Sequence, residues 1–222
     1  PMPDFRAFAR LSNETGSYDL AGPDSFRTST EGTDVDGFRL YQGRTSLPPG
    51  VYRAYFGVQN TVSGELFSFG ERLTVPDFRK DTFAISSITL ASRLEPSERP
   101  EQDVPFQVGR LLVIPKMEPV YAPASDLAYY FQVYHPAQDS ATGEARLDLS
   151  YQFLQADAVQ KTGEPDFEPL GKPLSFENQT GLVHGYSFPL KGWPVGEFKL
   201  VITVKDRVTQ RLLQAEARFT VR

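Results

Sequence analysis

The chain contains two histidines, His135 and His184, and histidine is the side chain best suited to acid–base chemistry or zinc binding near neutral pH. Neither lies in an H-x-x-x-H or H-x-E arrangement, and no cysteine is available to complete a zinc site. His135 ends an apolar, aromatic segment directly before a proline, which is typical of a polar residue at the end of a strand. We therefore expect no catalytic residue, no metal site and no cofactor site.

An acidic loop is the best candidate for binding a hard cation, because Glu31, Asp34 and Asp36 precede Gly37 and Ca²⁺ prefers oxygen ligands from such loops. The full spacing of a calcium-binding loop is absent, and Asp and Gly also form ordinary turns. The prediction is a solvated turn, with calcium binding by these three carboxylates as the alternative.

Aromatic residues give the candidates for stacking on sugar rings, namely Trp193, Tyr130 and Tyr134. Alternation places Tyr130 and Tyr134 on one face of a strand, and one face of that strand must belong to the core. Trp193 directly precedes a Pro-Val-Gly corner, where a packed side chain is expected. A structural role is favoured for Trp193 over glycan stacking.

Motifs and composition exclude several function classes. The sequence has no G-x-S-x-G, P-loop, G-x-G-x-x-G or H-E-x-x-H motif, so hydrolase and nucleotide-binding functions lack support. A net charge of −5 and a pI near 5.2 argue against nucleic acid as a partner, because phosphate contacts need clustered Lys and Arg. No apolar run approaches the roughly 18 residues of a membrane span.

The elements that carry these residues are best defined by an internal repeat. Residues 48–76 align with residues 194–222 without a gap, at a constant offset of 146 positions. The identical pairs are Pro48/Pro194, Gly50/Gly196, Val58/Val204, Val62/Val208, Leu66/Leu212, Arg72/Arg218, Thr74/Thr220 and Val75/Val221. Each copy reads as a Pro/Gly corner, an alternating strand, a polar turn and a second strand, which predicts a β-hairpin.

Further strands are predicted at residues 5–11, 37–41, 83–92, 110–114, 127–135, 145–154 and 183–189, although 126–130 could also form a short helical turn. Many short strands separated by turn residues predict an all-β chain of tandem immunoglobulin-like or fibronectin-III-like β-sandwiches. Residues 95–105 and 159–169 are predicted to be charged, Pro-containing loops.

Two domains are predicted, residues 1–76 and residues 82–222, with a boundary between Pro76 and Thr82. The first domain is too short for a full copy of the second. It is therefore either a shorter sandwich or one truncated at its N-terminus. The predicted buried residues are Phe56, Val58, Phe198, Ile202 and Phe219.

The repeat resembles the last hairpin of immunoglobulin-like and fibronectin-III-like bacterial modules. The segments VPDF, FAISSITLAS, LLVIP, LAYYFQVYHP and GYSFPLKGWPVGEFKLVITVKDRVT are similar to the β-rich C-terminal regions of bacterial GWxTD-domain and related envelope proteins, over roughly residues 48–222. The motif that names this family is absent, because Gly192-Trp193 is followed by Pro-Val-Gly. The resemblance implies an exported setting and no catalytic residues.

The sequence thus predicts a non-enzymatic structural or interaction module of an exported bacterial protein, in the periplasm or outside the cell. Its partner would be a protein that contacts strand edges or end loops. The alternatives are a carbohydrate-binding module, with polysaccharide as the partner, and an accessory region of a larger enzyme.

Overall fold

The structure is a computed structural model that describes residues 5–13, 19–20, 33–35, 37–40, 47–78, 82–98, 106–156 and 166–222. These residues form strands, turns and loops, with no helix, so the fold is all-β as predicted. No helix among them is long and apolar enough to cross a membrane. The chain divides into two compact units, Pro1–Lys80 and Asp81–Arg222.

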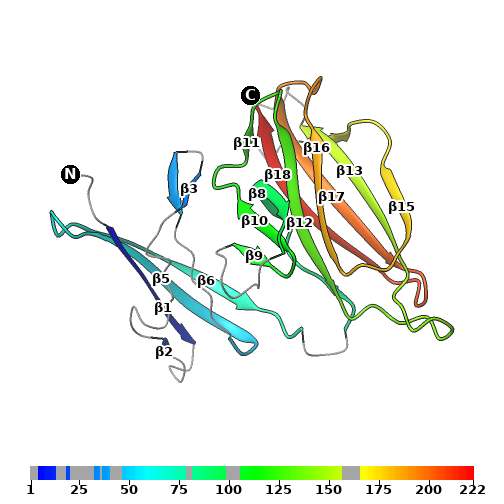
Figure 1. Ribbon diagram of the computed structural model, residues 1–222, viewed down its shortest axis with the longest axis horizontal. Coiled ribbons are helices and arrows are strands. Elements are labelled where there is room, and N and C mark those ends of the chain that lie inside the picture. Colours follow the sequence, from blue (N-terminus) through cyan, green and yellow to red (C-terminus); the bar gives the residue numbers. More distant parts are fainter. Residues whose placement is uncertain are drawn as a thin grey trace. The chain divides into compact units, whose positions relative to one another are not determined.

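The first unit is built around one antiparallel sheet in the order β2-β1-β5-β6 (Figure 1). A two-stranded sheet of β3 and β4 accompanies it. The bounds of these strands are β1 Phe5–Asn13, β2 Asp19–Leu20, β3 Thr33–Val35, β4 Phe38–Leu40, β5 Gly50–Asn60 and β6 Leu66–Val75. Within the described residues, β6 forms the outer edge and pairs with β5 alone.

The second unit contains two larger sheets, ordered β16-β12-β8-β10-β9 with β7 beside β12, and β11-β18-β17-β13-β14 with β15 beside β13. The strands of the first sheet are β7 Ala84–Ile85, β8 Thr89–Pro96, β9 Gln107–Val108, β10 Leu111–Pro115, β12 Asp126–Tyr134 and β16 Val183–Pro189. Those of the second sheet are β11 Val120–Tyr121, β13 Leu147–Ala156, β14 Phe167–Pro169, β15 Leu174–Gln179, β17 Gly196–Asp206 and β18 Leu212–Val221.

The two sheets of the second unit share one apolar core. Alternate residues of β13 and β17 point into it and are fully buried, and the Tyr129 ring on β12 lies 5.7 Å from the Tyr151 ring on β13. Figure 1 shows β12 and β16 lying over β17 and β18. The period-two pattern of the sequence therefore marks the face that each strand turns toward the other sheet.

The predicted hairpin repeat is confirmed down to its register. Gly50 pairs with Val75 in the first unit, and Gly196 pairs with Val221 in the second. Both glycines have a positive φ, 156° and 150°, which side-chain-bearing residues rarely adopt, and this explains why both copies keep glycine at the corner.

The turns that close the two hairpins are also equivalent. Asn60 and Asp206 each accept two backbone N–H groups on the side-chain Oδ1, at 2.8–3.2 Å, from the residues two and three positions later. The loop at 139–144 repeats this geometry around Asp139. The fifth position of each turn has positive φ and is occupied by Gly64, Gly143 and Gln210. Short polar side chains thus provide the turn chemistry that the sequence pattern predicts.

The repeat extends beyond the hairpin to a whole sheet. Strand β1 pairs with β5 as β13 pairs with β17, and β2 and β14 lie next on the far side of β1 and β13. Residues 5–13 therefore correspond to residues 147–155 in strand pairing. The sheet β2-β1-β5-β6 is thus a counterpart of β14-β13-β17-β18.

The outer edges of the two sheets differ at one backbone donor. In the second unit, the N–H groups of Thr220 and Arg222 donate to the carbonyls of Pro119 and Tyr121, which holds the parallel strand β11 against β18. The residue equivalent to Arg222 in the first unit is Pro76, which has no N–H. A strand placed like β11 would lose one of these two hydrogen bonds at β6.

Some predictions from the sequence were wrong in detail. Val58 was predicted to be buried but is 36% exposed, and Phe56 is half-buried. Phe198, Ile202 and Phe219 are buried as predicted. The loop predicted at 159–169 contains strand β14, since a short edge strand with little alternation leaves no clear pattern, and residues 126–130 form a strand rather than a helical turn.

Candidate functional site

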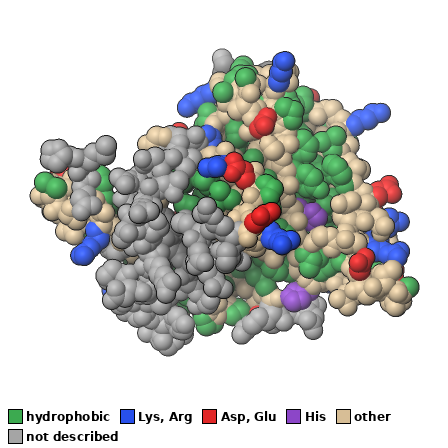
Figure 2. All heavy atoms as spheres, viewed as in Figure 1, with side chains coloured by type: hydrophobic (Ala, Val, Ile, Leu, Met, Phe, Trp, Pro, Cys, Tyr) green, Lys and Arg blue, Asp and Glu red, His purple; other side chains and the backbone are tan. Residues whose placement is uncertain are grey.

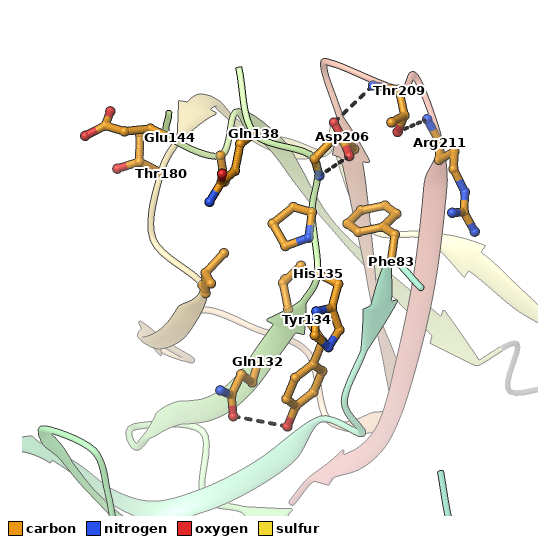
Figure 3. Close-up of a pocket in the computed structure, with 15 residues that line it drawn as sticks. Phe83, Gln132, Tyr134, His135, Gln138, Glu144, Thr180, Asp206, Thr209 and Arg211 are labelled. Carbon is orange, nitrogen blue, oxygen red and sulfur yellow. Dashed lines mark hydrogen bonds between the residues drawn. The ribbon is translucent and has the colours of Figure 1, made fainter. Parts of the chain in front are cut away.

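A hollow with a volume of about 800 Å³ lies in the second unit (Figure 3). It opens beside the end of β12, between that strand and the turn that joins β17 to β18. Its lining is Phe83, Gln132, Val133, Tyr134, His135, Pro136, Ala137, Gln138, Glu144, Ala145, Thr180, Leu182, Asp206, Thr209 and Arg211. The mixture of apolar and polar groups suits a small ligand or a loop from a partner.

The most buried polar group of this hollow, Asp206, is engaged in holding the fold. Its Oδ2 accepts the backbone N–H of Ala137 at 2.9 Å, and its Oδ1 accepts those of Val208 and Thr209. Burial alone would favour the protonated acid, but these hydrogen bonds dominate and hold the pKa of Asp206 below its ordinary value. This carboxylate is therefore a structural anion.

The side chains of Tyr134, Thr209 and Arg211 in this hollow are also hydrogen-bonded or stacked. The Tyr134 hydroxyl donates to Gln132 Oε1 at 3.1 Å, and burial raises the pKa of this tyrosine. The Arg211 guanidinium lies 6.0 Å from the centre of the Phe83 ring, in a cation–π contact. Thr209 accepts the Arg211 backbone N–H. No chemical reaction is assigned to this set, and the absence of enzymatic activity stays a prediction.

The two histidines occupy different environments. His135 follows β12 directly, is exposed, has a φ of 49° and lines the hollow. His184 lies on β16, is buried, and stacks on Phe131 with 4.9 Å between ring centres. Its burial lowers the pKa, although a hydrogen bond with the Gly181 backbone acts in the opposite direction. Among the described residues no group of three or more His, Asp or Glu could hold a metal ion.

The three candidate stacking residues do not share one exposed surface. Tyr130 is buried in a small cluster with Ala91 and Val113, whereas Tyr134 lines the hollow. Trp193 packs against the second unit's core, with its ring 4.9 Å from Phe153, 5.3 Å from Phe198 and 6.1 Å from Phe219. This placement agrees with the packed role expected for Trp193, and glycan stacking at these residues stays a prediction.

The candidate calcium loop falls mostly outside the described residues. Glu31 and Asp36 lie outside them. Asp34 belongs to β3, where its backbone lies opposite that of Arg39 in β4. Calcium binding therefore stays a prediction.

A surface that the sequence analysis did not identify lies on the sheet of the first unit. One face of β5 and β6 carries Tyr52, Ala54, Phe56 and Val58 with Phe67 and Phe69 opposite them. The corner end of this face is covered, since Tyr52 and Ala54 are buried. At the turn end Phe67 and Phe69 are 68% and 64% exposed. The Phe69 ring stacks on its cross-strand partner Phe56, with 5.2 Å between ring centres.

The equivalent face of the second unit is covered. Val58 corresponds to Val204, which is fully buried, and Phe67 corresponds to Leu213, which packs against the core. The covering residues come from the other sheet, chiefly Leu127, Tyr129, Phe131 and Val133 of β12. Alignment of the two copies could have identified the equivalence of Phe67 with Leu213, but only the structure shows that Phe67 and Phe69 are exposed at the turn end.

Charges on the visible described face of the second unit are mixed, because Lys and Arg side chains lie beside Asp and Glu side chains (Figure 2). Ion pairs in this unit include Arg207 with Asp148 and Arg146 with Asp139. This view offers no field of a single sign for a highly charged polymer.

None of the protein-family models matches this chain, and no curated protein does. Among solved structures, the chain is similar to the crystal structure of the PmoD soluble domain from Methylocystis sp. ATCC 49242 (Rockwell), with 12% identity over 62% of this chain and 90% of that chain. The TM-score is 0.29, which is too low to carry an argument about fold or function.

Proposed function

We propose that this protein is a non-catalytic interaction module whose first unit receives the apolar β-sheet face of a protein partner. The proposal rests on one observation: Phe67 and Phe69 are exposed on the same sheet face whose counterpart in the second unit is buried under another sheet. Adjacent exposed aromatic residues on a flat surface mark interaction sites more often than isolated apolar residues do.

The second unit supports the choice of partner chemistry. There, the equivalent strands are covered by alternating aromatic and aliphatic residues of β12, so the cover that fits this type of face is a β-sheet with large apolar side chains. A protein strand or sheet of that composition would bury Phe67 and Phe69 in the same way.

The wider setting of the proposal is a tandem arrangement of immunoglobulin-like or fibronectin-III-like β-sandwiches, residues 1–76 and 82–222, in an exported bacterial protein. The support for this setting is the repeated sheet together with the resemblance of residues 48–222 to envelope proteins. A periplasmic or extracellular location belongs to the same proposal.

Site-specific photocrosslinking tests the proposal. Benzoylphenylalanine at Phe67 should give one saturable crosslinked product with another protein in cells of the source organism. Phe69→Ser should abolish that product while the protein stays folded, with a loss of stability of about 1 kcal/mol or less. The matched control is benzoylphenylalanine at Leu212, which is similarly exposed on β18 of the second unit. Equal products at both positions, or no product at Phe67, would overturn the proposal.

A further inference from the structure

The hollow at the end of β12 has three walls that come from segments far apart in the sequence. Gln138 follows β12, Thr180 lies between β15 and β16, and Arg211 lies in the turn between β17 and β18. Figure 3 shows Gln138, Glu144 and Thr180 on one side of the hollow and Arg211 on the other. Loops that gather at one end of two packed sheets are a frequent position for binding sites.

The walls are joined to one another by hydrogen bonds within the chain. Asp206 joins the loop after β12 to the turn after β17, because it accepts the backbone N–H groups of Ala137 and Thr209. The Val133 N–H donates to the Leu182 carbonyl at 2.8 Å, which ties the third wall to β12. The shape of the hollow is therefore set before a ligand enters, and a preformed site loses less conformational freedom on binding.

The backbone is strained where β12 enters the hollow. His135 has a φ of 49°, which residues with a side chain rarely adopt, and it directly precedes Pro136, which restricts the backbone of the residue before it. Tyr134, His135 and Pro136 all line the hollow. Strained backbone of this type gathers at ligand sites.

Several polar side chains of the hollow have hydrogen-bonding capacity left over. Gln138, Glu144 and Thr180 are exposed, and none of these side chains makes a hydrogen bond or ion pair with another described residue. The Arg211 guanidinium lies over the Phe83 ring, and its N–H groups have no acceptor among the residues that the structure describes. One side of the hollow thus offers a carboxylate and the other a guanidinium.

These groups favour a neutral ligand with several hydroxyl groups. A carboxylate only accepts hydrogen bonds and a guanidinium only donates them, whereas a hydroxyl group does both. A ligand rich in hydroxyl groups therefore satisfies Glu144 and Arg211 at the same time. An anion would be attracted by Arg211 but repelled by Glu144, and a cation would meet the reverse. The apolar surfaces of Tyr134 and Pro136 suit the C–H face of a sugar ring.

A peptide fits the hollow less well. Extended peptides are usually bound along the free edge of a strand, through regular main-chain hydrogen bonds. Strand β12, which ends at the hollow, is paired with β16 on one side and with β7 and β8 on the other. The groups that remain available are side chains spread over separate walls, and such a set suits the separate hydroxyl groups of a sugar.

We propose that the hollow at the end of β12 binds a short neutral oligosaccharide, whose hydroxyl groups contact Glu144 and Arg211 and whose ring lies on Tyr134. The volume of about 800 Å³ is within the range of small-molecule sites, about 300–1,000 Å³. This inference goes beyond the proposed protein interaction, because it concerns the other unit and another class of ligand. Of the three aromatic candidates from the sequence, only Tyr134 takes part.

An array of neutral oligosaccharides tests the site. It carries α- and β-linked hexoses and N-acetylhexosamines, and calorimetry then titrates the full chain with the tightest binder. Binding should be saturable, and Gln138→Ala and Thr180→Val should each weaken it about fivefold. Gln214→Ala is the matched control, since Gln214 is exposed on β18 outside the hollow, and it should change binding less than about twofold. Equal effects of Gln138→Ala and Gln214→Ala would overturn the proposal.

Two measurements on the unmodified chain make the test independent of the variants. NMR chemical-shift changes should centre on residues 134–138, 180–182 and 209–211. Raising NaCl from about 0.05 M to about 0.5 M should change the affinity less than about twofold, because the ligand carries no charge for salt to screen.

The proposal is overturned if no sugar on the array binds saturably or if the shift changes centre elsewhere. Tighter binding of trigalacturonate, or of a member of a short-peptide library, than of any neutral sugar would also overturn it. Phe69→Ser should leave oligosaccharide binding unchanged, which separates this site from the crosslinking surface.

Discussion

The Asp206 carboxylate accepts a hydrogen bond of 2.9 Å from the backbone N–H of Ala137, 69 positions earlier in the sequence. Ala137 follows β12, and Asp206 ends β17, so this bond joins the two sheets of the second unit at their turn end. The same carboxylate closes the turn between β17 and β18 through Val208 and Thr209. One side chain therefore fixes both a local turn and a long-range contact.

Asp206→Ala should lower the free energy of unfolding by about 3 kcal/mol, because it removes a charged acceptor and leaves three partly buried backbone N–H groups without a partner. Asn60→Ala is the matched control, since Asn60 closes the equivalent turn but only with exposed, local hydrogen bonds. It should cost about 1 kcal/mol or less. Urea denaturation measures both, and equal losses would contradict a long-range role for Asp206.

His184 should make stability depend on pH below neutrality. Burial lowers the pKa of His184 in the folded state, whereas in the unfolded chain the pKa has its ordinary value of about 6.5. The unfolded chain therefore binds a proton more readily as the pH falls. Stability from this group is full above that value and decreases as pH falls toward the lower folded pKa. Urea midpoints at pH 7.5 and 5.5 should differ more for the wild type than for His184→Gln, and an unchanged difference would refute this assignment.

Phe219→Ala should cost about 3–5 kcal/mol, because Phe219 is buried and stacks on Phe198 with 5.4 Å between ring centres. Phe69→Ala should cost about 1 kcal/mol or less, since most of that ring is already in contact with water. Thermal and urea unfolding of the two variants provide the comparison. A large loss at Phe69 would show that its face is covered in solution.

Gly143→Ala should destabilise the second unit by about 1 kcal/mol, because Gly143 has a φ of 71°. Gln210 occupies the same turn position with a φ of 60°, so Gln210→Gly should be neutral or stabilising despite the loss of its hydrogen bond to the Arg207 carbonyl. Differential scanning calorimetry measures both changes, and a large loss in Gln210→Gly would mean that the side-chain bond outweighs the backbone conformation.

The sequence predicted those parts of the fold that depend on local chemistry. The hairpins, their corners at Gly50 and Gly196 and their Asn or Asp turns follow from alternation and turn residues, and the structure confirms them. Val58 was assigned to the core because alternation shows which face a residue occupies. Alternation does not show whether another sheet covers that face. Such coverage depends on contacts between segments that are distant in the sequence.

The candidate sites show the same division. The positions of Phe67 and Phe69 follow from the repeat, since they align with Leu213 and Ala215 at a fixed offset, but only the structure shows that both phenylalanines are exposed. The large hollow at the end of β12 brings together segments from Phe83 to Arg211, and no local pattern in the sequence predicts that meeting.

Two similar hairpins on one chain create a risk of misfolding, because β11, which pairs with β18 in the native fold, could pair with β6 instead. Pro76 reduces this risk. Strand β11 uses the Arg222 N–H to hold itself on β18, and the first hairpin presents a proline at that point and cannot make the bond. The loss of this hydrogen bond disfavours domain-swapped chains in which β11 pairs with β6 of the first hairpin.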